Sequence, residues 1–108
     1  MQLIQETYSL TEEFPKREIY GLVAQMRRGV ISIPANIAEG HERGTTKDFL
    51  RFLSIAAGSL RELQTYFDVS LLLKYATDLQ LKRPRELANE TGRMLCGLRD
   101  ALRSKVVP

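Results

Sequence analysis

Apolar residues recur every three or four positions along most of the chain, which is the spacing of helices that bury one side. The clearest run covers residues 19–37 and passes Pro34 without losing phase. Its members are Ile19, Val23, Met26, Val30, Ile33 and Ile37. We therefore predict a helix that continues through Pro34 with a kink there, because proline removes a backbone donor and clashes with the preceding turn. Gly40 and Gly44 are predicted to end it.

A longer helix is predicted over about residues 46–75, with Thr45 as its N-cap and Asp48 as the partner in the first turn. Its main apolar row is Phe49, Leu53, Ala56, Leu60, Leu63 and Phe67. A second row lies roughly 60° around the helix and consists of Phe52, Ile55, Ser59, Tyr66, Val69 and Leu73. Since this apolar face is wider than one neighbouring pair of helices requires, we expect contact with another subunit. The alternative is the central helix of a monomeric bundle, with an exposed apolar patch.

Two shorter patterns flank these helices. A first helix is predicted to end before Phe14, since Pro15 disfavours helical dihedrals in the residue before it. A last helix is predicted to follow Pro84, which a first turn tolerates, and to end in a frayed segment at residues 106–108.

The four predicted helices define the fold class. Short connections between consecutive helices imply antiparallel neighbours, so we predict an all-α fold, an antiparallel up-down-up-down four-helix bundle with helix two kinked near Pro34. Residues 1–108 are predicted to form a single domain. The composition agrees, with 44% hydrophobic and 27% charged residues and no Trp.

Cysteine content and hydropathy bear on the compartment. Cys96 is the only cysteine and cannot form an internal disulfide, which is typical of a reducing cytoplasm. The first ten residues lack the features of a secretion signal, and the densest apolar run is too short to span a bilayer. We expect a cytoplasmic protein with no membrane contact.

Candidate chemistry is sparse. His41 is the only histidine, and Glu39 and Glu42 beside it lack the Glu-x-x-His spacing of helical metal sites. No glycine-rich phosphate loop occurs, and Cys96 has no evident base beside it, although catalytic partners can come from distant positions. We expect no enzyme activity, no metal and no cofactor. A small hydrolase centred on His41 is the alternative.

The charge of the chain permits nucleic-acid binding without demanding it. Sixteen Lys and Arg against 13 Asp and Glu give a net charge of +3. Residues 1–14 carry three acids and no base, whereas residues 77–108 carry the basic excess. The candidate nucleic-acid contacts are Arg27, Arg28, Arg43, Lys47, Lys82, Arg83, Arg85, Arg99 and Arg103.

Each of these basic clusters alone is more often a solvated helix face than a binding site. A homo-oligomer would repeat one patch around an axis and multiply its phosphate contacts. Because the four tyrosines are spread over several helices, we expect recognition of backbone and shape in structured RNA or duplex, with little base readout.

Four stretches together carry a family resemblance. They are FPKREIYGL at 14–22, QMRR at 25–28, SIPANIAEG at 32–40 and FLRFLSIAAGSLREL at 49–63. The sequence resembles the 23S rRNA intervening-sequence protein family, also called the four-helix-bundle protein family, over about residues 8–103. The resemblance implies a small antiparallel bundle that forms a homopentamer, encoded in some bacteria within insertions in large-subunit rRNA genes. A related branch resembles the accessory proteins of diversity-generating retroelements, which bind a reverse transcriptase and nucleic acid.

The stretch SIPANIAEG contains a predicted structural motif made of Pro34, Asn36, Glu39 and Gly40. Ala35 and Ala38 are predicted to let a neighbouring helix approach closely. We expect Glu39 to bond the start of the next helix near Thr45 and Thr46, where free backbone amides can donate to a carboxylate. A ligand-binding role for Glu39 is the alternative.

Together these features favour a non-enzymatic, homo-oligomeric bundle that binds structured RNA or other nucleic acid through its basic clusters and is pentameric by resemblance. The alternative is a protein-interaction adaptor that docks an enzyme partner such as a reverse transcriptase.

Overall fold

Four α-helices and one short 3-10 helix make up the computed structural model, which describes residues 1–105. They are α1 (Gln2–Glu12), η1 (Lys16–Glu18), α2 (Leu22–Glu42), α3 (Thr46–Leu72) and α4 (Asp78–Arg103). This confirms the predicted all-α, four-helix fold. The predicted frayed end at 106–108 lies outside the described residues. Within residues 1–105, none of the helices is long and apolar enough to cross a membrane.

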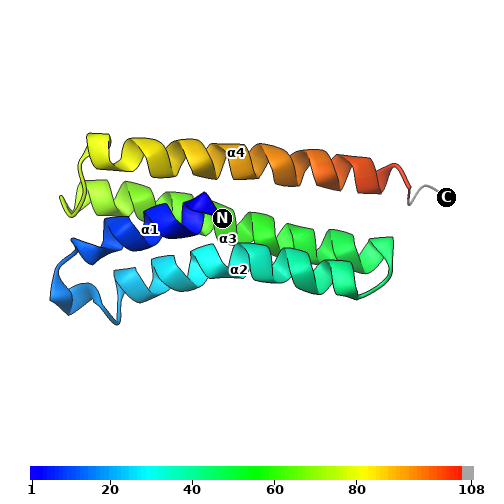
Figure 1. Ribbon diagram of the computed structural model, residues 1–108, viewed down its shortest axis with the longest axis horizontal. Coiled ribbons are helices and arrows are strands. Elements are labelled where there is room, and N and C mark those ends of the chain that lie inside the picture. Colours follow the sequence, from blue (N-terminus) through cyan, green and yellow to red (C-terminus); the bar gives the residue numbers. More distant parts are fainter. Residues whose placement is uncertain (106–108) are drawn as a thin grey trace.

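The helices are of unequal length, and this decides the shape of the molecule. In Figure 1 the chain runs along the long axis in α2, returns in α3 and runs forward again in α4, whereas α1 lies over one end only. α3 packs against α2 and α4, and α1 packs against the same two helices. In the described part of the chain the backbones of α2 and α4 are not adjacent. The position between them is therefore filled by α1 at one end of the bundle.

The buried core draws on all four helices. The predicted apolar rows face it: its members on α2 and α3 include Val23, Met26, Val30, Ile33, Leu53, Ala56, Leu60, Leu63 and Phe67. α1 contributes Leu3 and Leu10, and α4 contributes Leu81, Leu87, Ala88 and Leu95. Burying each of the larger side chains stabilises the fold by roughly 1.5–3 kcal/mol before the loss of chain entropy. The spacing of apolar residues thus correctly predicted which side of α2 and of α3 faces the core.

The start of α2 differs from the prediction. Ile19 is not in the helix and is 53% exposed. The reason is local, because the Glu18 carboxylate accepts the free amide N–H of Leu22 at 3.3 Å and so begins the helix there. Tyr75 holds this carboxylate from the α3–α4 connection, donating its hydroxyl to Glu18 Oε2 at 2.8 Å.

The turn between α2 and α3 was partly predicted. Gly44 has a φ of +84°, a conformation that glycine adopts without strain, and it separates the helices as expected. Thr45 is confirmed as N-cap, since its hydroxyl accepts the N–H of Asp48 at 3.1 Å. Gly40, however, lies inside α2 and does not end it. α2 is continuous through Pro34, and the kink there stays a prediction.

The prediction that the last helix follows Pro84 is wrong. α4 begins at Asp78, where Thr77 and Gln80 form a reciprocal capping box. The Gln80 N–H donates to the Thr77 hydroxyl at 3.2 Å, and the Thr77 N–H donates to the Gln80 side chain at 2.9 Å. This cap and the fully buried Leu81 stabilise the first turns of α4. Their stabilisation offsets the cost of Pro84, which lies buried inside the helix. α3 ends at Leu72, three residues before its predicted end.

Candidate nucleic-acid interface

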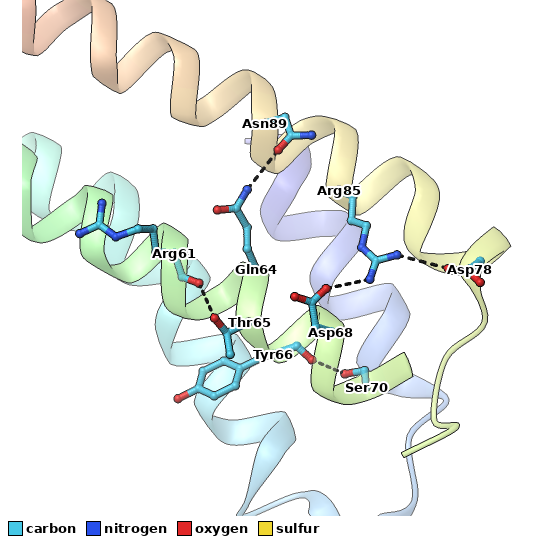
Figure 2. A network of polar contacts seen from close by, with 9 residues as sticks. All are labelled: Arg61, Gln64, Thr65, Tyr66, Asp68, Ser70, Asp78, Arg85 and Asn89. Carbon is cyan, nitrogen blue, oxygen red and sulfur yellow. Dashed lines mark hydrogen bonds and ion pairs between the residues drawn. The ribbon is translucent and has the colours of Figure 1, made fainter. Parts of the chain in front are cut away.

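The predicted basic cluster at residues 82–85 is largely used within the fold. Figure 2 shows Arg85 of α4 reaching both Asp68 of α3 and Asp78, with N–O distances of 2.9 and 3.4 Å. Arg83 pairs with Glu86 at 3.6 Å. It also donates to the Gln2 side-chain oxygen of α1 at 3.0 Å. Lys82 is exposed and has no ion pair among residues 1–105.

Arg43 and Arg103 also have acidic partners on their own helices. Arg103 pairs with Asp100 at 3.5 Å, and Arg43 pairs with Glu39 at 3.0 Å. The prediction that Glu39 bonds the start of α3 is therefore wrong. The Thr45 hydroxyl already accepts the N–H of Asp48 there, and the i,i+4 spacing brings Glu39 to Arg43 instead.

Arg43 belongs to a small cluster that sequence reasoning missed. Its guanidinium carbon lies 5.0 Å from the centre of the Phe52 ring, and that of Arg51 lies 4.5 Å from the same ring. Arg51 was not among the predicted nucleic-acid contacts. Lys47, one turn before Arg51, is exposed. Cation–π contacts thus hold two arginines at the α2–α3 corner.

α2 approaches α3 closely at Gly40. A Cβ atom added there would lie 2.7 Å from the Cβ of Phe52, so only glycine fits without a shift of the backbone. Ala35 and Ala38, predicted to allow this approach, are exposed. The expected close contact exists, but it depends on the buried glycine.

Polar contacts join the middle of α2 to α3. Asn36 donates its side-chain amide to the carbonyl of Ser32 at 2.8 Å and to the Ser32 hydroxyl at 2.9 Å. The Ser32 hydroxyl lies 2.9 Å from that of Ser59 on α3. Asn36 was predicted as a structural residue without a partner, and its contacts now define that role. Pro34, two residues away, is partly buried.

These serines border a hollow of about 670 Å³ formed by α1, α2 and α3. Its lining includes Tyr8, Gln25, Arg27, Arg28, Gly29, Ile31, Ser32, Ser59, Glu62 and Tyr66. We call it the α1–α2–α3 hollow. Its walls combine guanidinium, hydroxyl and phenol groups with one carboxylate, which are groups that can bind a polar, partly aromatic ligand.

The two adjacent arginines of this hollow have different roles. Arg27 holds α1 on α2: its guanidinium carbon lies 4.6 Å from the Tyr8 ring centre, and its Nε donates to the Thr11 hydroxyl at 3.0 Å. Glu12 lies 3.9 Å from the same guanidinium. Arg28 is exposed and has no ion pair within the described residues. Its five N–H donors are therefore free to bind a phosphate.

Two tyrosines meet at the hollow, although the sequence placed them on separate helices. Tyr8 comes from α1 and Tyr66 from α3, and both are partly buried and line the same hollow as Arg28. Residues so far apart in the sequence come together only because α1 and α3 flank the same side of α2. With Arg28, they form a site where aromatic contact with a base and phosphate binding can occur together.

The remaining predicted residues lie elsewhere. Arg99 is half-buried, and its Nε has no partner within residues 1–105. His41 is exposed and contacts the Phe49 ring edge-on, with ring centres 5.7 Å apart. Among the described residues, no three His, Cys, Asp or Glu side chains are grouped as a metal site requires.

The comparisons with known proteins agree with the fold. The family model described as 23S rRNA-intervening sequence protein matches residues 1–97. The chain belongs to this family. The resemblance seen in the sequence is thereby confirmed. Two of the four stretches that carry it, residues 32–40 and 49–63, lie on the neighbouring helices α2 and α3. The comparison with curated proteins finds no match.

Proposed function

We propose that this protein is a non-enzymatic, cytoplasmic homo-oligomer that binds structured RNA, with the α1–α2–α3 hollow as the main contact. The observation that carries the proposal is Arg28, exposed and without an ion pair in the described chain, beside Tyr8 and Tyr66. Phosphate binding by Arg28 supplies affinity, and the aromatic side chains accept an unstacked base.

The family description supports RNA as the ligand class, because it names an insertion in 23S rRNA. The hollow also suits RNA on chemical grounds. Ser32 and Ser59 place hydroxyl groups on its wall, and the Glu62 carboxylate can accept a hydrogen bond from a ribose 2′-hydroxyl. Lys47, Lys82 and Arg99 then act as additional phosphate contacts.

An oligomer is supported by apolar side chains that the single chain leaves uncovered. Ile55 and Leu73, from the predicted second apolar row, are 43% and 48% exposed. A subunit contact would remove this surface from water. Five subunits is the number that the family resemblance implies. Each further subunit adds one copy of Arg28 to the RNA-binding surface, which raises affinity at low salt.

A salt-dependent binding assay tests the proposal. We expect the purified protein to bind a fluorescent hairpin from 23S rRNA, measured by anisotropy, and to bind it less at physiological than at low salt. Arg28→Gln should weaken binding and reduce the slope of log affinity against log salt by about one for each phosphate that the variant no longer binds. Lys82→Gln makes the same charge change away from the hollow and should have a smaller effect. No binding at low salt, or equal effects of the two variants, would contradict the proposed site.

A protein-interaction adaptor is the second candidate function, with an enzyme such as a reverse transcriptase as the partner that the resemblance suggests. The observation that favours it is an apolar groove of about 590 Å³ between α2 and α4, lined chiefly by Ile37, Phe49, Met94, Leu95 and Leu98.

A further inference from the structure

Two opposite charges line the α1–α2–α3 hollow without neutralising each other. Arg28 comes from α2 and Glu62 from α3. Both side chains are exposed, and neither forms an ion pair with the other or with any residue among 1–105. The other charged residue of the lining, Arg27, is already held by Tyr8 and Thr11. The hollow therefore offers a ligand both a cation and a carboxylate.

The packing of α2 against α3 places these two charges opposite each other. The hydroxyl oxygens of Ser32 and Ser59 lie 2.9 Å apart and mark a point where the two helices meet. Because α3 runs back along α2 (Figure 1), Arg28 and Glu62 each lie about one turn from this serine pair, in the same direction. A ligand that lies between the two helices can thus contact both charges at once.

Tyr66 provides an aromatic surface beside the carboxylate. It follows Glu62 by four residues, so the two side chains lie on the same side of α3. Figure 2 shows the Tyr66 ring turned away from α4, the helix that Gln64 and Asp68 contact. Within residues 1–105 no other ring or cation is stacked on it. A flat base can therefore rest against Tyr66 with one edge toward Glu62.

The chemistry of a carboxylate decides which base suits this position. A carboxylate only accepts hydrogen bonds. Guanine presents two neighbouring donors on its Watson–Crick edge, N1–H and the N2 amino group, which match the two oxygens of Glu62. Adenine and cytosine present one amino group beside a ring nitrogen that accepts, and uracil presents one N–H between two carbonyl groups. A ribose hydroxyl also donates only once, so guanine is the best partner of this carboxylate.

The hollow is large enough for one nucleotide. Its volume of about 670 Å³ lies within the range of roughly 300–1,000 Å³ that is usual for small-molecule sites. We propose that it binds an unpaired guanosine of an RNA, with the phosphate at Arg28, the base against Tyr66, and N1–H and the N2 amino group donating to Glu62. This inference rests on the proposed RNA binding and adds a base preference to it.

Hairpins that differ at one loop position test this preference. Each has the same stem and a loop of uridines with guanosine, inosine, adenosine or cytidine at its centre, and binding is measured by anisotropy at low salt. The protein should bind the guanosine hairpin about tenfold more tightly than the adenosine hairpin, since a bidentate contact discriminates to this extent. Inosine lacks the N2 amino group and should be intermediate, which tests the contact without altering the protein.

Substitutions separate the base contact from the phosphate contact. Glu62→Gln should remove the preference, because an amide replaces one acceptor with a donor. The ratio of guanosine to adenosine affinity is compared, since losing a negative charge raises the affinity for every RNA. Glu90→Gln makes the same change on α4, outside the lining of the hollow, and should keep the ratio. Arg28→Gln should weaken both hairpins by the same factor, because a phosphate contact carries no base information.

Failure of this inference can be told apart from failure of RNA binding. Equal affinity for all the hairpins, or a preference that Glu62→Gln retains in a protein shown to be folded by circular dichroism, would overturn the guanine contact alone. No binding of any hairpin at low salt would contradict the RNA-binding function itself. Free GMP should displace the guanosine hairpin at lower concentration than AMP, and equal displacement would also overturn the contact. GMP binding by a protein that binds no hairpin would assign the hollow to a free nucleotide instead of RNA.

Discussion

Ser32 of α2 and Ser59 of α3 place their hydroxyl oxygens 2.9 Å apart, and both residues belong to stretches that carry the family resemblance. Asn36 donates to Ser32 from the next turn of α2. Each polar group in this chain of contacts has a partner, so the network favours one register of α2 against α3. An apolar interface would tolerate sliding of one helix along the other more readily.

Removing one hydroxyl of this network should destabilise the fold. Ser59→Ala deprives the partly buried Ser32 hydroxyl of its partner on α3 and should lower the free energy of unfolding by about 1 kcal/mol. Urea unfolding followed by circular dichroism measures the change. Thr65→Ala is the control, because that exposed hydroxyl donates to the Arg61 carbonyl of its own helix and, among residues 1–105, makes no contact with α2. Equal effects of the two substitutions would show that the contact between α2 and α3 adds no stability.

Gly40 should not tolerate a methyl group. In Gly40→Ala the new Cβ would meet Phe52 at 2.7 Å and push α2 from α3, at a cost of about 1–3 kcal/mol. Gly97→Ala serves as the comparison, because nothing lies within 4 Å of a Cβ added at that exposed helical position. That variant should be unchanged or more stable by about 0.5–1 kcal/mol. Thermal melting distinguishes the two, and an unaltered Gly40→Ala protein would refute the close approach.

The contact between Glu18 and Tyr75 should make stability depend on pH. The Tyr75 hydroxyl, then the Leu22 amide and the Arg17 charge, lower the pKa of Glu18 from its ordinary value of 4.5. A lowered pKa in the folded state means that the stabilisation is present above pH 4.5 and is lost as the pH falls through the pKa of the folded protein. Tyr75→Phe removes the largest cause, so its melting temperature should fall less steeply below pH 4.5.

Other carboxylates titrate in the same range, so the difference between the two proteins is the quantity to measure. Tyr20→Phe, at an almost fully exposed tyrosine, provides the control and should follow the wild-type curve. Parallel curves for wild type and Tyr75→Phe would exclude the Glu18 contact as a source of the pH dependence.

Arg85 should matter for stability rather than for RNA binding. Arg85→Gln breaks its bridge between Asp68 and Asp78. Both carboxylates are largely exposed, so the loss should be modest, about 0.5–1 kcal/mol at low salt, and smaller at high salt. Lys82→Gln, at an exposed residue without an ion pair among residues 1–105, should leave unfolding unaltered. A salt-independent loss would point to packing of the Arg85 stem instead of the ion pairs.

Much of the fold follows from local spacing. The apolar rows of α2 and α3 could be read from the sequence because a helix places every third or fourth residue on the same side. Thr45 could be recognised as a cap for a similar reason, since its bond to Asp48 spans only three residues. Helix ends were less predictable. Ile19 fits the apolar row, but α2 begins three residues after it, at Leu22, whose N–H donates to the Glu18 carboxylate. Tyr75, which also bonds this carboxylate, is distant in the sequence, so local spacing could not reveal its role.

The candidate sites depended on how the helices pack. Spacing within one helix carries no information on which residue of another helix lies opposite, so it could not pair Arg85 with Asp68 or bring Tyr8 and Tyr66 to one hollow. The basic residues could be identified in the sequence, but their acidic partners could not. The packing of the helices determines those partners, and therefore which basic residues can still bind a ligand.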